Sequence, residues 1–282
     1  MYKGLSEYTM KDQENTKKQE NLNEKKKPIT IQMTDGVLIP NKNNGKILNS
    51  WRITFYFALL ALLSLIVFFP DPYREIFLVC IQGTPVTFQC TVFAIIGAVI
   101  IGTITGLGSV SKHHIINMIS GVYVELIRGI PLLVQLIFIY YALGRFFHLS
   151  GITAAIIALA ICFGAYMGEI VRAGIQAIPK GQMEAAIALG LSRYQAFRYV
   201  ILPQTLKVVL PAVGNEFISM LKDSSLVSVI ALSDILRRGK EYISRTFLSL
   251  ETMLVVALIY LIITLILSRL VGKLEERMNS NA

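Results

Sequence analysis

Charged residues are scarce in this chain. They make up 16% of its 282 residues, whereas hydrophobic residues make up 54% and the mean hydropathy is +0.59. An ordinary soluble domain contains about 25% charged residues, so this composition excludes that class of protein. We expect most of the chain to lie in lipid.

Cysteine and histidine are also rare. Cys80, Cys90 and Cys162 are odd in number and far apart, which excludes a disulfide framework and a metal-ligand spacing, so we interpret them as small packing residues. His113 and His114 are adjacent and have no cysteine or carboxylate companion. We interpret them as a loop pair at the membrane surface and not as zinc ligands.

Motifs for nucleotide binding and catalysis are absent. The Gly-Lys pairs of the chain are Gly45-Lys46, Gly239-Lys240 and Gly272-Lys273, and none completes the G-x-x-x-x-G-K-[ST] loop that binds phosphate. The sequence also lacks a nucleophile elbow and an H-E-x-x-H helix. We therefore predict that this chain is not an enzyme and holds no cofactor or metal of its own.

Positive charge is distributed unevenly. Of the 27 Lys and Arg residues, nine Lys and Arg52 precede the first long apolar run, which indicates a cytoplasmic N-terminus and not a nucleic-acid partner. Residues 1–51 are rich in Lys, Glu, Asn and Gln, and we predict a disordered cytoplasmic tail there. The first apolar run starts near Ile53, too late for the core of a cleaved signal peptide, so we expect the N-terminus to be retained.

Long apolar stretches predict an all-α membrane protein. A spanning helix needs about 20 mostly apolar residues. Six stretches qualify, at about 52–69, 86–109, 123–146, 151–172, 205–225 and 250–270. An even number of spans places both termini in the cytoplasm. The basic residues between the last two spans would then lie outside, and an amphipathic helix on the outer surface would accommodate them; they are Arg237, Arg238, Lys240 and Arg245.

A polar and basic stretch interrupts the apolar runs. It reads EAAIALGLSRYQAFRYVILP, residues 184–203, and is called the elbow below. Glu184–Leu189 is a strong helix former, and Gly190 can end a helix in the left-handed conformation. Ser192 and Gln195 have the spacing of a capping box that starts a second short helix.

The second helix of the elbow is expected to end at Pro203. Tyr194, Phe197 and Ile201 form an apolar stripe along it, flanked by arginines. The spacing alone leaves two alternatives open: the stripe packs back on its own bundle, or it docks into a groove of a separate protein.

The elbow resembles the EAA loop of permease subunits of bacterial ATP-binding-cassette importers. The resemblance rests on Glu184-Ala185-Ala186, Gly190 and the Val-Ile-Leu-Pro of 200–203, where the loop usually has Ile in place of Val200. Three further segments are similar to the polar-amino-acid permeases: ELIRGIPLLVQL (125–136), AYMGEIVRAGIQAIPKGQ (165–182) and LPAVGNEFISMLKDSSL (210–226).

The resemblance implies the organisation of the chain. Residues 83–275 would form a five-span permease core with cytoplasmic coupling helices, residues 52–82 an accessory first span with an outer loop, and residues 276–282 a cytoplasmic C-terminus. In such importers the elbow docks into a cleft of the ATPase. Its coupling residues would be Glu184, Ala185, Ala186, Gly190, Arg193, Tyr194 and Phe197.

The resemblance also implies partners. The chain would lie in the bacterial inner membrane, in contact with lipid, beside a second permease subunit that is either identical or different. A cytoplasmic ATPase pair would bind ATP and Mg, and an extracytoplasmic binding protein would deliver the amino acid. Nucleic acid is not expected as a partner.

The fifth predicted span contains ionisable groups. Each costs roughly 2.5–3.5 kcal/mol in lipid, so such groups usually face a cavity or a partner. Glu216 and Asp223 are seven residues apart, hence on one helix face, and would favour a cationic amino acid. The substrate-binding residues predicted from this face and its neighbours are Asn215, Glu216, Ser219, Met220 and Asp223.

An alternative role for these acids is structural, in salt bridges with Arg128 or Arg172 of other spans. We interpret Glu169 and Arg172 as an interfacial pair, and Arg128 as a structural residue at the start of the third span.

Two other functions compete with import driven by a separate ATPase. A stand-alone ion-coupled transporter or channel often has repeated halves, and no internal repeat is found here. A non-transporting membrane scaffold could use the elbow to recruit a partner, but it would give the intramembrane acids no role.

Overall fold

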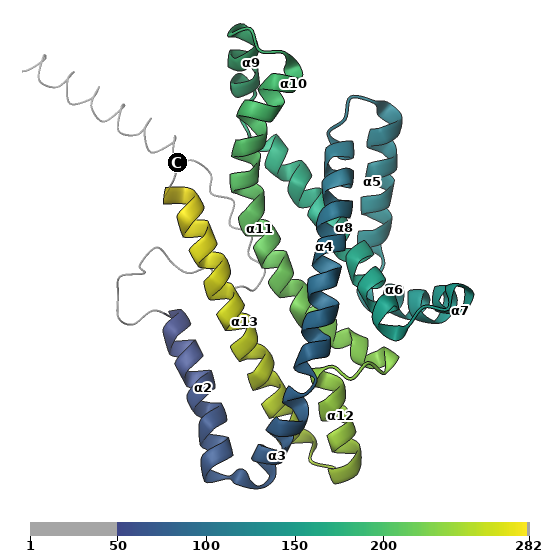
Figure 1. Ribbon diagram of the computed structural model, residues 1–282, viewed down its shortest axis with the longest axis vertical. Coiled ribbons are helices and arrows are strands. Elements are labelled where there is room, and N and C mark those ends of the chain that lie inside the picture. The colour runs from purple at the N-terminus through teal and green to yellow at the C-terminus, as the bar shows by residue number, and fades with distance from the viewer. Residues whose placement is uncertain (1–49, 281–282) are drawn as a thin grey trace, which may run out of the picture. The chain divides into compact units, whose positions relative to one another are not determined.

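The computed structural model describes residues 50–280, and within this range it contains helices and turns but no strand (Figure 1). The all-α prediction is confirmed. Five helical segments are long and apolar enough to cross a membrane, or six if one bent pair crosses as a unit. The predicted tail of residues 1–51 lies almost wholly outside the described residues.

The helical elements follow one another with short connections. In chain order they are α2 (Ser50–Phe68), α3 (Pro70–Ile81), α4 (Thr84–Ser109), α5 (His114–Gly129), α6 (Leu132–Phe138), η1 (Ile139–Leu143), α7 (Gly144–Phe147), α8 (Gly151–Gln176), α9 (Lys180–Ala188), α10 (Arg193–Ala196), η2 (Phe197–Ile201), α11 (Leu202–Asp223), η3 (Ser224–Ile230), α12 (Ile235–Thr246) and α13 (Ser249–Ser280). Elements η1 and η2 are π turns, and η3 is a 3₁₀ helix.

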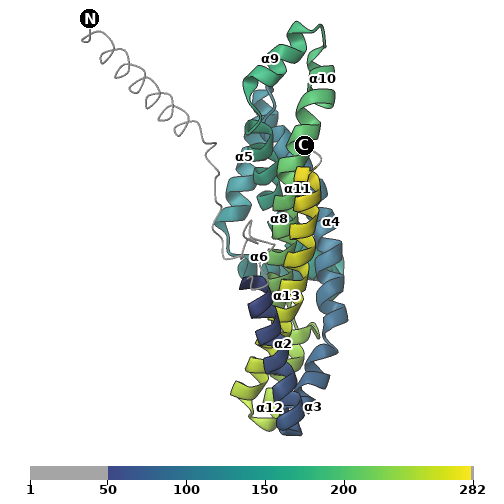
Figure 2. The same cartoon turned by 90° about the vertical axis from the view of Figure 1, so that its left-hand side faces the viewer.

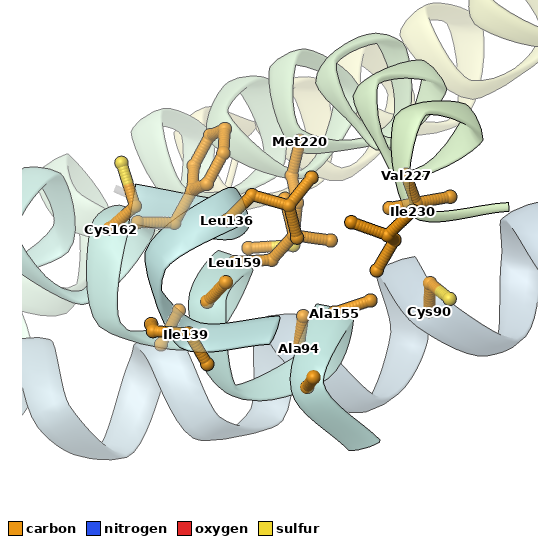
Figure 3. Packing of buried hydrophobic residues seen from close by; sticks show 14 of the residues in the cluster. Cys90, Ala94, Leu136, Ile139, Ala155, Leu159, Cys162, Met220, Val227 and Ile230 are labelled. Carbon is orange, nitrogen blue, oxygen red and sulfur yellow. The ribbon is translucent and has the colours of Figure 1, made fainter. Parts of the chain in front are cut away.

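Small residues bring α4 and α8 into close contact. A Cβ atom added at Gly102 of α4 would lie 2.2 Å from the Cβ of Met167, and one at Gly106 would lie 2.6 Å from the Cβ of Val171. Such close approach is how helices associate in lipid, where hydrophobic burial gives little drive. The main apolar cluster begins nearer the start of α4, where Cys90 and Ala94 contribute to it (Figure 3).

The three cysteines are buried free thiols, as their interpretation as packing residues predicted. Cys90 and Cys162 belong to the main cluster of α4, α6, α8 and η3, whereas Cys80 belongs to a second cluster formed by α2, α3, α12 and α13. The described bundle therefore has two apolar cores.

Helix α2 is fixed to α13 by its first residues. The indole N–H of Trp51 donates a hydrogen bond to the carbonyl of Leu265 at 2.9 Å, and the guanidinium of Arg269 lies 5.7 Å from the Trp51 ring centroid. Ala58 and Leu62 bury the same face of α2 in the second cluster. The helix thus runs alongside α13 (Figure 2), and most of its other side chains are exposed and apolar, as a lipid-facing span requires.

The third predicted span, 123–146, is not one straight helix. Helix α5 ends at Gly129, α6 starts at Leu132, and the two segments meet at an angle of 99°. Pro131 is the cause, because a proline disfavours the helical conformation of the residue before it, and Ile130 is extended (φ −106°, ψ 129°). Arg128 therefore lies at the end of a helix, not at the start of a span.

The break leaves backbone carbonyls that need partners. The side-chain amide of Gln135 donates to the carbonyl of Ile127 at 2.7 Å and to that of Ile130 at 2.8 Å. Broken helices in membranes depend on such substitutes for lost backbone bonds. Gln135 is buried, and it stabilises the bend from within the protein.

Pro203 does not end the second helix of the elbow, contrary to the prediction. Helical structure continues from Arg193 through η2 and α11 to Asp223, and Pro211 lies inside α11 without interrupting it. The π turn of η2 is wider than an α-helical turn, and Pro203 follows it in the first turn of α11, where its missing N–H costs least.

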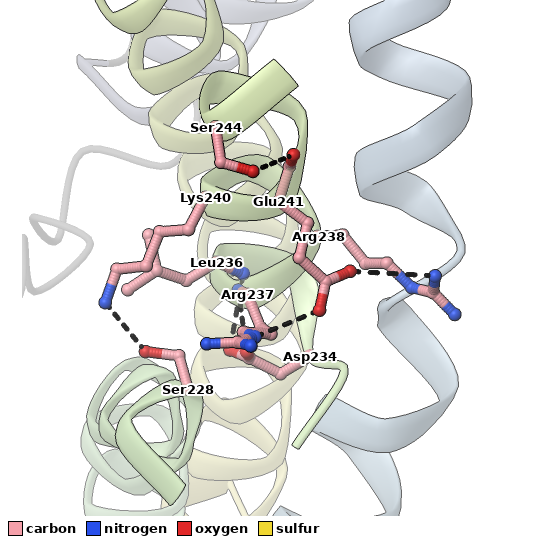
Figure 4. Close-up of polar contacts among 8 residues, drawn as sticks. All are labelled: Ser228, Asp234, Leu236, Arg237, Arg238, Lys240, Glu241 and Ser244. Carbon is pink, nitrogen blue, oxygen red and sulfur yellow. Dashed lines mark hydrogen bonds and ion pairs between the residues drawn. The ribbon is translucent and has the colours of Figure 1, made fainter. Parts of the chain in front are cut away.

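The basic segment after the fifth span forms the predicted amphipathic helix, α12. Arg237 and Arg238 pair with Glu241 at 3.0 and 3.9 Å, and Lys240 donates to the hydroxyl of Ser228 at 3.1 Å (Figure 4). These contacts engage the basic side chains within the protein. The opposite face of α12 packs in the second cluster.

A buried carboxylate anchors α12. Asp234 is fully buried, and its side chain accepts hydrogen bonds from the backbone N–H groups of Leu236 and Arg237 and from the hydroxyl of Tyr260 on α13. Burial raises the pKa of the Asp234 carboxyl, while the bonds that it accepts act in the opposite direction. The backbone also approaches α4 closely here, since a Cβ at Gly83 would lie 2.3 Å from the carbonyl carbon of Asp234.

Asp234→Ala is expected to lower the free energy of unfolding by about 1–3 kcal/mol, because it removes a helix cap and leaves the buried Tyr260 hydroxyl without its acceptor. Asp234→Asn is the matched control. It can cap the helix without a charge, and the raised pKa means that the fold favours the neutral form. Thermal unfolding of the purified protein checks this order, and equal midpoints for the two variants would contradict it.

Candidate functional site

The elbow contains a glycine with a left-handed backbone conformation. Gly190 has φ +86°, and no atom would lie within 4 Å of a Cβ added to it, so backbone conformation and not space restricts this position. The N–H of Gly190 donates to the carbonyl of Ile187, and that of Leu191 to the carbonyl of Ala186. This pair of bonds is the Schellman motif that ends a helix, here α9. The predicted glycine bend is confirmed.

The capping box that starts α10 is also confirmed. The hydroxyl of Ser192 accepts from the backbone N–H of Gln195 at 3.3 Å, and the Gln195 side-chain oxygen accepts from the N–H of Ser192 at 2.9 Å. Backbone N–H groups at the start of a helix have no acceptor within the helix. Without these two bonds, the N–H groups of Ser192 and Gln195 would have to bond to water. The two motifs together fix the angle between α9 and α10.

The predicted apolar stripe is divided between two surfaces. Tyr194 is 69% exposed, whereas Ile201 is 5% exposed and Phe197 is half-buried. The π turn of η2 explains the difference, because a wider turn changes which residues before and after it share a face. Packing back on the bundle therefore applies to Ile201 and in part to Phe197, whereas for the exposed Tyr194 docking into a separate protein stays a prediction.

Other elbow side chains make up its exposed and buried surfaces. Ala186 and Ala196 are buried, and Phe197 lines an apolar pocket of about 350 Å³ between α4, α8 and α11. The exposed large apolar residues are Ile187, Leu189, Tyr194 and Tyr199. Sequence reasoning did not predict that Ile187, Leu189 and Tyr199 would be exposed. For Leu189 a signal was available, because it directly precedes Gly190, where the helix ends.

The remaining predicted coupling residues surround this exposed surface. Glu184, Ala185 and Arg193 are exposed, as is Lys180 at the start of α9. The elbow thus presents apolar side chains next to basic ones. It is joined to the membrane-spanning part by α8 on one side and by the continuous helix through η2 and α11 on the other.

The predicted substrate residues lie in the second half of α11. Asn215 and Asp223 are exposed, and Glu216 and Ser219 are half-buried. Met220 is fully buried and packs in the main apolar cluster with residues such as Leu136 (Figure 3). The Met220 side chain therefore has no exposed surface within the described residues.

The acids lie near the seam between α11 and α8. Glu216 and Asp223 are within electrostatic reach of Cys162 and of Tyr166, which are one turn apart on α8. The guanidinium carbon of Arg128 lies 5.2 Å from the centroid of the Tyr166 ring. Sequence reasoning missed Tyr166, because only the fold brings α5, α8 and α11 together there.

Arg172 has a different set of partners. It forms an ion pair through two nitrogens with Glu169, three residues before it, and donates to the side chain of Gln176 at 3.0 Å. The predicted Glu169–Arg172 pair is confirmed. Arg172 is engaged along α8, and the guanidinium of Arg128 lies over the ring of Tyr166.

Within residues 50–280, no group of three or more His, Cys, Asp or Glu side chains is arranged to hold a metal ion. Carboxylates, an aromatic hydroxyl and a guanidinium are groups that can hold a charged solute.

Comparisons with known proteins bear on these two places. The family model described as "Binding-protein-dependent transport system inner membrane component" matches residues 98–280. The chain is 42% identical over 201 residues to the glutamine transport system permease protein GlnP of Escherichia coli K12, covering 70% of this chain and 92% of the relative. It is 36% identical over 203 residues to the arginine transport system permease protein ArtQ of Bacillus subtilis, covering 71% and 93%.

Solved structures give a similar result. A chain of the crystal structure of an amino acid ABC transporter with histidines has a TM-score of 0.68 and 41% identity, with coverage of 76% of this chain and 97% of that one. The inward-facing MetNI methionine ABC transporter has a TM-score of 0.61 at 20% identity, which shows a shared fold.

Ser192→Ala is expected to loosen the start of α10, because it removes one of the two bonds of the capping box. The cost should be about 1 kcal/mol, which corresponds to roughly fivefold faster hydrogen exchange at the Gln195 amide. Ser192→Asp, which keeps a capping oxygen, is the control and should exchange as the parent does. Equal exchange in the alanine variant would show that the cap does not hold this helix.

Proposed function

Because the chain belongs to the family of binding-protein-dependent transport system inner membrane components, we propose that it imports polar amino acids by alternating access driven by a separate ATPase. The chain is a multi-pass permease subunit of an amino-acid ABC transporter. One observation carries the proposal. A rigid polar elbow at one end of α11 is joined by unbroken helix to the face that carries Glu216 and Asp223.

The elbow suits docking into a cleft of the ATPase. Its exposed apolar side chains, Ile187, Leu189 and Tyr194, would fill a groove, and Arg193 together with the neighbouring Lys180 of α9 would meet an acidic rim. Closure of the ATPase pair on ATP and Mg would move the elbow. Nucleotide can favour one state only through differential affinity for the two states, and a rigid elbow supplies that difference mechanically.

The acids of α11 support recognition of a cationic group. Two carboxylates near one helix face would attract Arg, Lys, His or ornithine and repel Asp and Glu. The named relatives include glutamine and arginine systems, and a similar solved transporter was crystallised with histidines. These names agree with a polar amino acid as the substrate.

The proposal fixes an orientation and a set of partners. The elbow and both termini would lie in the cytoplasm, and α12 outside, where an extracytoplasmic binding protein delivers the amino acid. A second permease copy, identical or different, would complete the pathway. Lipid would cover exposed apolar side chains such as those of α2.

Uptake into vesicles tests the function. The permease is reconstituted with its ATPase and binding protein. Uptake of radiolabelled Arg, His, Gln and Glu is then measured with and without ATP on the side of the membrane where the ATPase lies. We expect ATP-dependent uptake of Arg, His or Gln and little of Glu. Uptake by the permease alone, without the ATPase, would favour the stand-alone transporter instead.

Gly190→Val is expected to uncouple hydrolysis from import. A β-branched residue is strained at φ +86°, at a cost of roughly 1–2 kcal/mol, so α9 would lose its fixed angle to α10. Import should fall at least fivefold while the reconstituted complex still hydrolyses ATP.

Two controls accompany this variant. Gly190→Asn tolerates the left-handed conformation, and Gly181→Ala changes a glycine of α9 that has open space and an ordinary φ. Both should import nearly as well as the parent. Full import by Gly190→Val would remove the role assigned to the bend.

Asp223→Asn is expected to reduce uptake of Arg about tenfold relative to uptake of Gln, because a charge-assisted bond to a cation is worth about 1.5–3 kcal/mol. Glu251→Gln, a neutralised acid in the first turn of α13, is the matched control and should leave the ratio unchanged. An unaltered Arg-to-Gln ratio in the Asp223 variant would contradict the cationic subsite.

A further inference from the structure

Arg128 is a cation in an unusual position. It lies in the last turn of α5, just before the break at Ile130 and Pro131. Its side chain is exposed, although the bent helical segment that contains it is long and apolar enough to cross a membrane. An arginine at membrane depth is costly unless it faces water, a partner or a ligand. The negative end of the α5 dipole lowers that cost but does not remove it.

The Tyr166 ring lies beneath this cation. The guanidinium carbon of Arg128 lies 5.2 Å from the ring centroid, within the range of a cation–π interaction. The charges of Glu216 and Asp223 on α11 act on the same Tyr166 side chain. One aromatic residue of α8 therefore contacts a positive group of α5 and feels two negative groups of α11.

We propose that Arg128 binds the α-carboxylate of the transported amino acid, at the opposite end of one site from Glu216 and Asp223, which bind its ammonium group or cationic side chain. This inference rests on the proposed function and deepens it. A guanidinium is planar and can donate two parallel hydrogen bonds to a carboxylate, so Arg128 is suited to this end. Tyr166 is a positioning residue that fixes the direction of the guanidinium.

The two-ended site explains how the protein would select amino acids over simple amines, which the acids alone do not explain. Carboxylates without a cation would bind any amine, including those that carry no carboxylate. With Arg128, the site requires both charges of a zwitterion. The acids can bind the α-ammonium that every amino acid carries, and a cationic side chain adds a second positive charge, so loss of one carboxylate should cost arginine more than glutamine, in agreement with the two kinds of relative.

Binding of paired ligands tests the proposal. The purified complex of permease and ATPase, without the binding protein, is titrated with arginine and with agmatine, which is arginine without its carboxylate. Glutamine and 4-aminobutanamide form a second pair. We expect the parent complex to bind each amino acid about 10- to 100-fold more tightly than its decarboxylated partner. Equal affinities within each pair would overturn the proposal without any variant.

Variants locate the preference. Arg128→Gln should reduce the affinity for arginine to that for agmatine and leave agmatine unchanged. Arg145→Gln, an exposed arginine of α7, is the matched control and should keep the parent preference. A loss of affinity for both ligands by the same factor in the Arg128 variant would mean a structural role, and would overturn the assignment.

Tyr166 has its own pair of variants. Tyr166→Phe retains the ring and should retain the preference for arginine over agmatine, whereas Tyr166→Ala should lose most of it. Identical behaviour of the two variants would contradict the positioning role. ATP-driven uptake by the parent separates a failure of the two-ended site from a failure of the proposed function. If uptake occurs but the parent binds arginine no more tightly than agmatine, the two-ended site is wrong and the proposed function stands.

Discussion

Lipid offers no hydrogen bonds, so a backbone that crosses it must satisfy its own polar groups. This constraint explains why helical structure continues past Pro211 to Asp223. A loop at Pro211 would expose unpaired carbonyls and amides to lipid. Nearer the elbow the helix also continues past Pro203, after the π turn of η2. The consequence is mechanical, since the water-facing elbow and the face that carries Glu216 and Asp223 belong to one continuous rod.

The same constraint has a different solution in α5 and α6. There the chain does break, at Ile130 and Pro131, and the buried side chain of Gln135 takes over the carbonyls that the break leaves free. A break is therefore tolerated only where protein supplies the missing partner. Its effect is to end α5 at Arg128, close to Tyr166 and to the seam that carries the acids.

Local features could be predicted from the sequence, and long-range ones could not. Gly190, Ser192 and Gln195 act through bonds to near neighbours, so their spacing was sufficient to predict the bend and the capping box. The helix break at Pro131 and the continuity past Pro203 depend on partners and on turn geometry that no spacing encodes. The burial of Met220 and the position of Tyr166 follow from packing between α6, α8 and α11, which a single sequence does not reveal.

The central claim is that the elbow and α11 move as one body. Spin labels at Ala188 and Val208, both exposed, measure the distance along this body, and a label at Ala188 in each of two permease copies measures the distance between elbows. The native cysteines are buried and should not react with the label. On addition of ATP to the full complex we expect the distance between copies to change and the distance within one chain to stay constant. A change within the chain as large as that between copies would contradict the account.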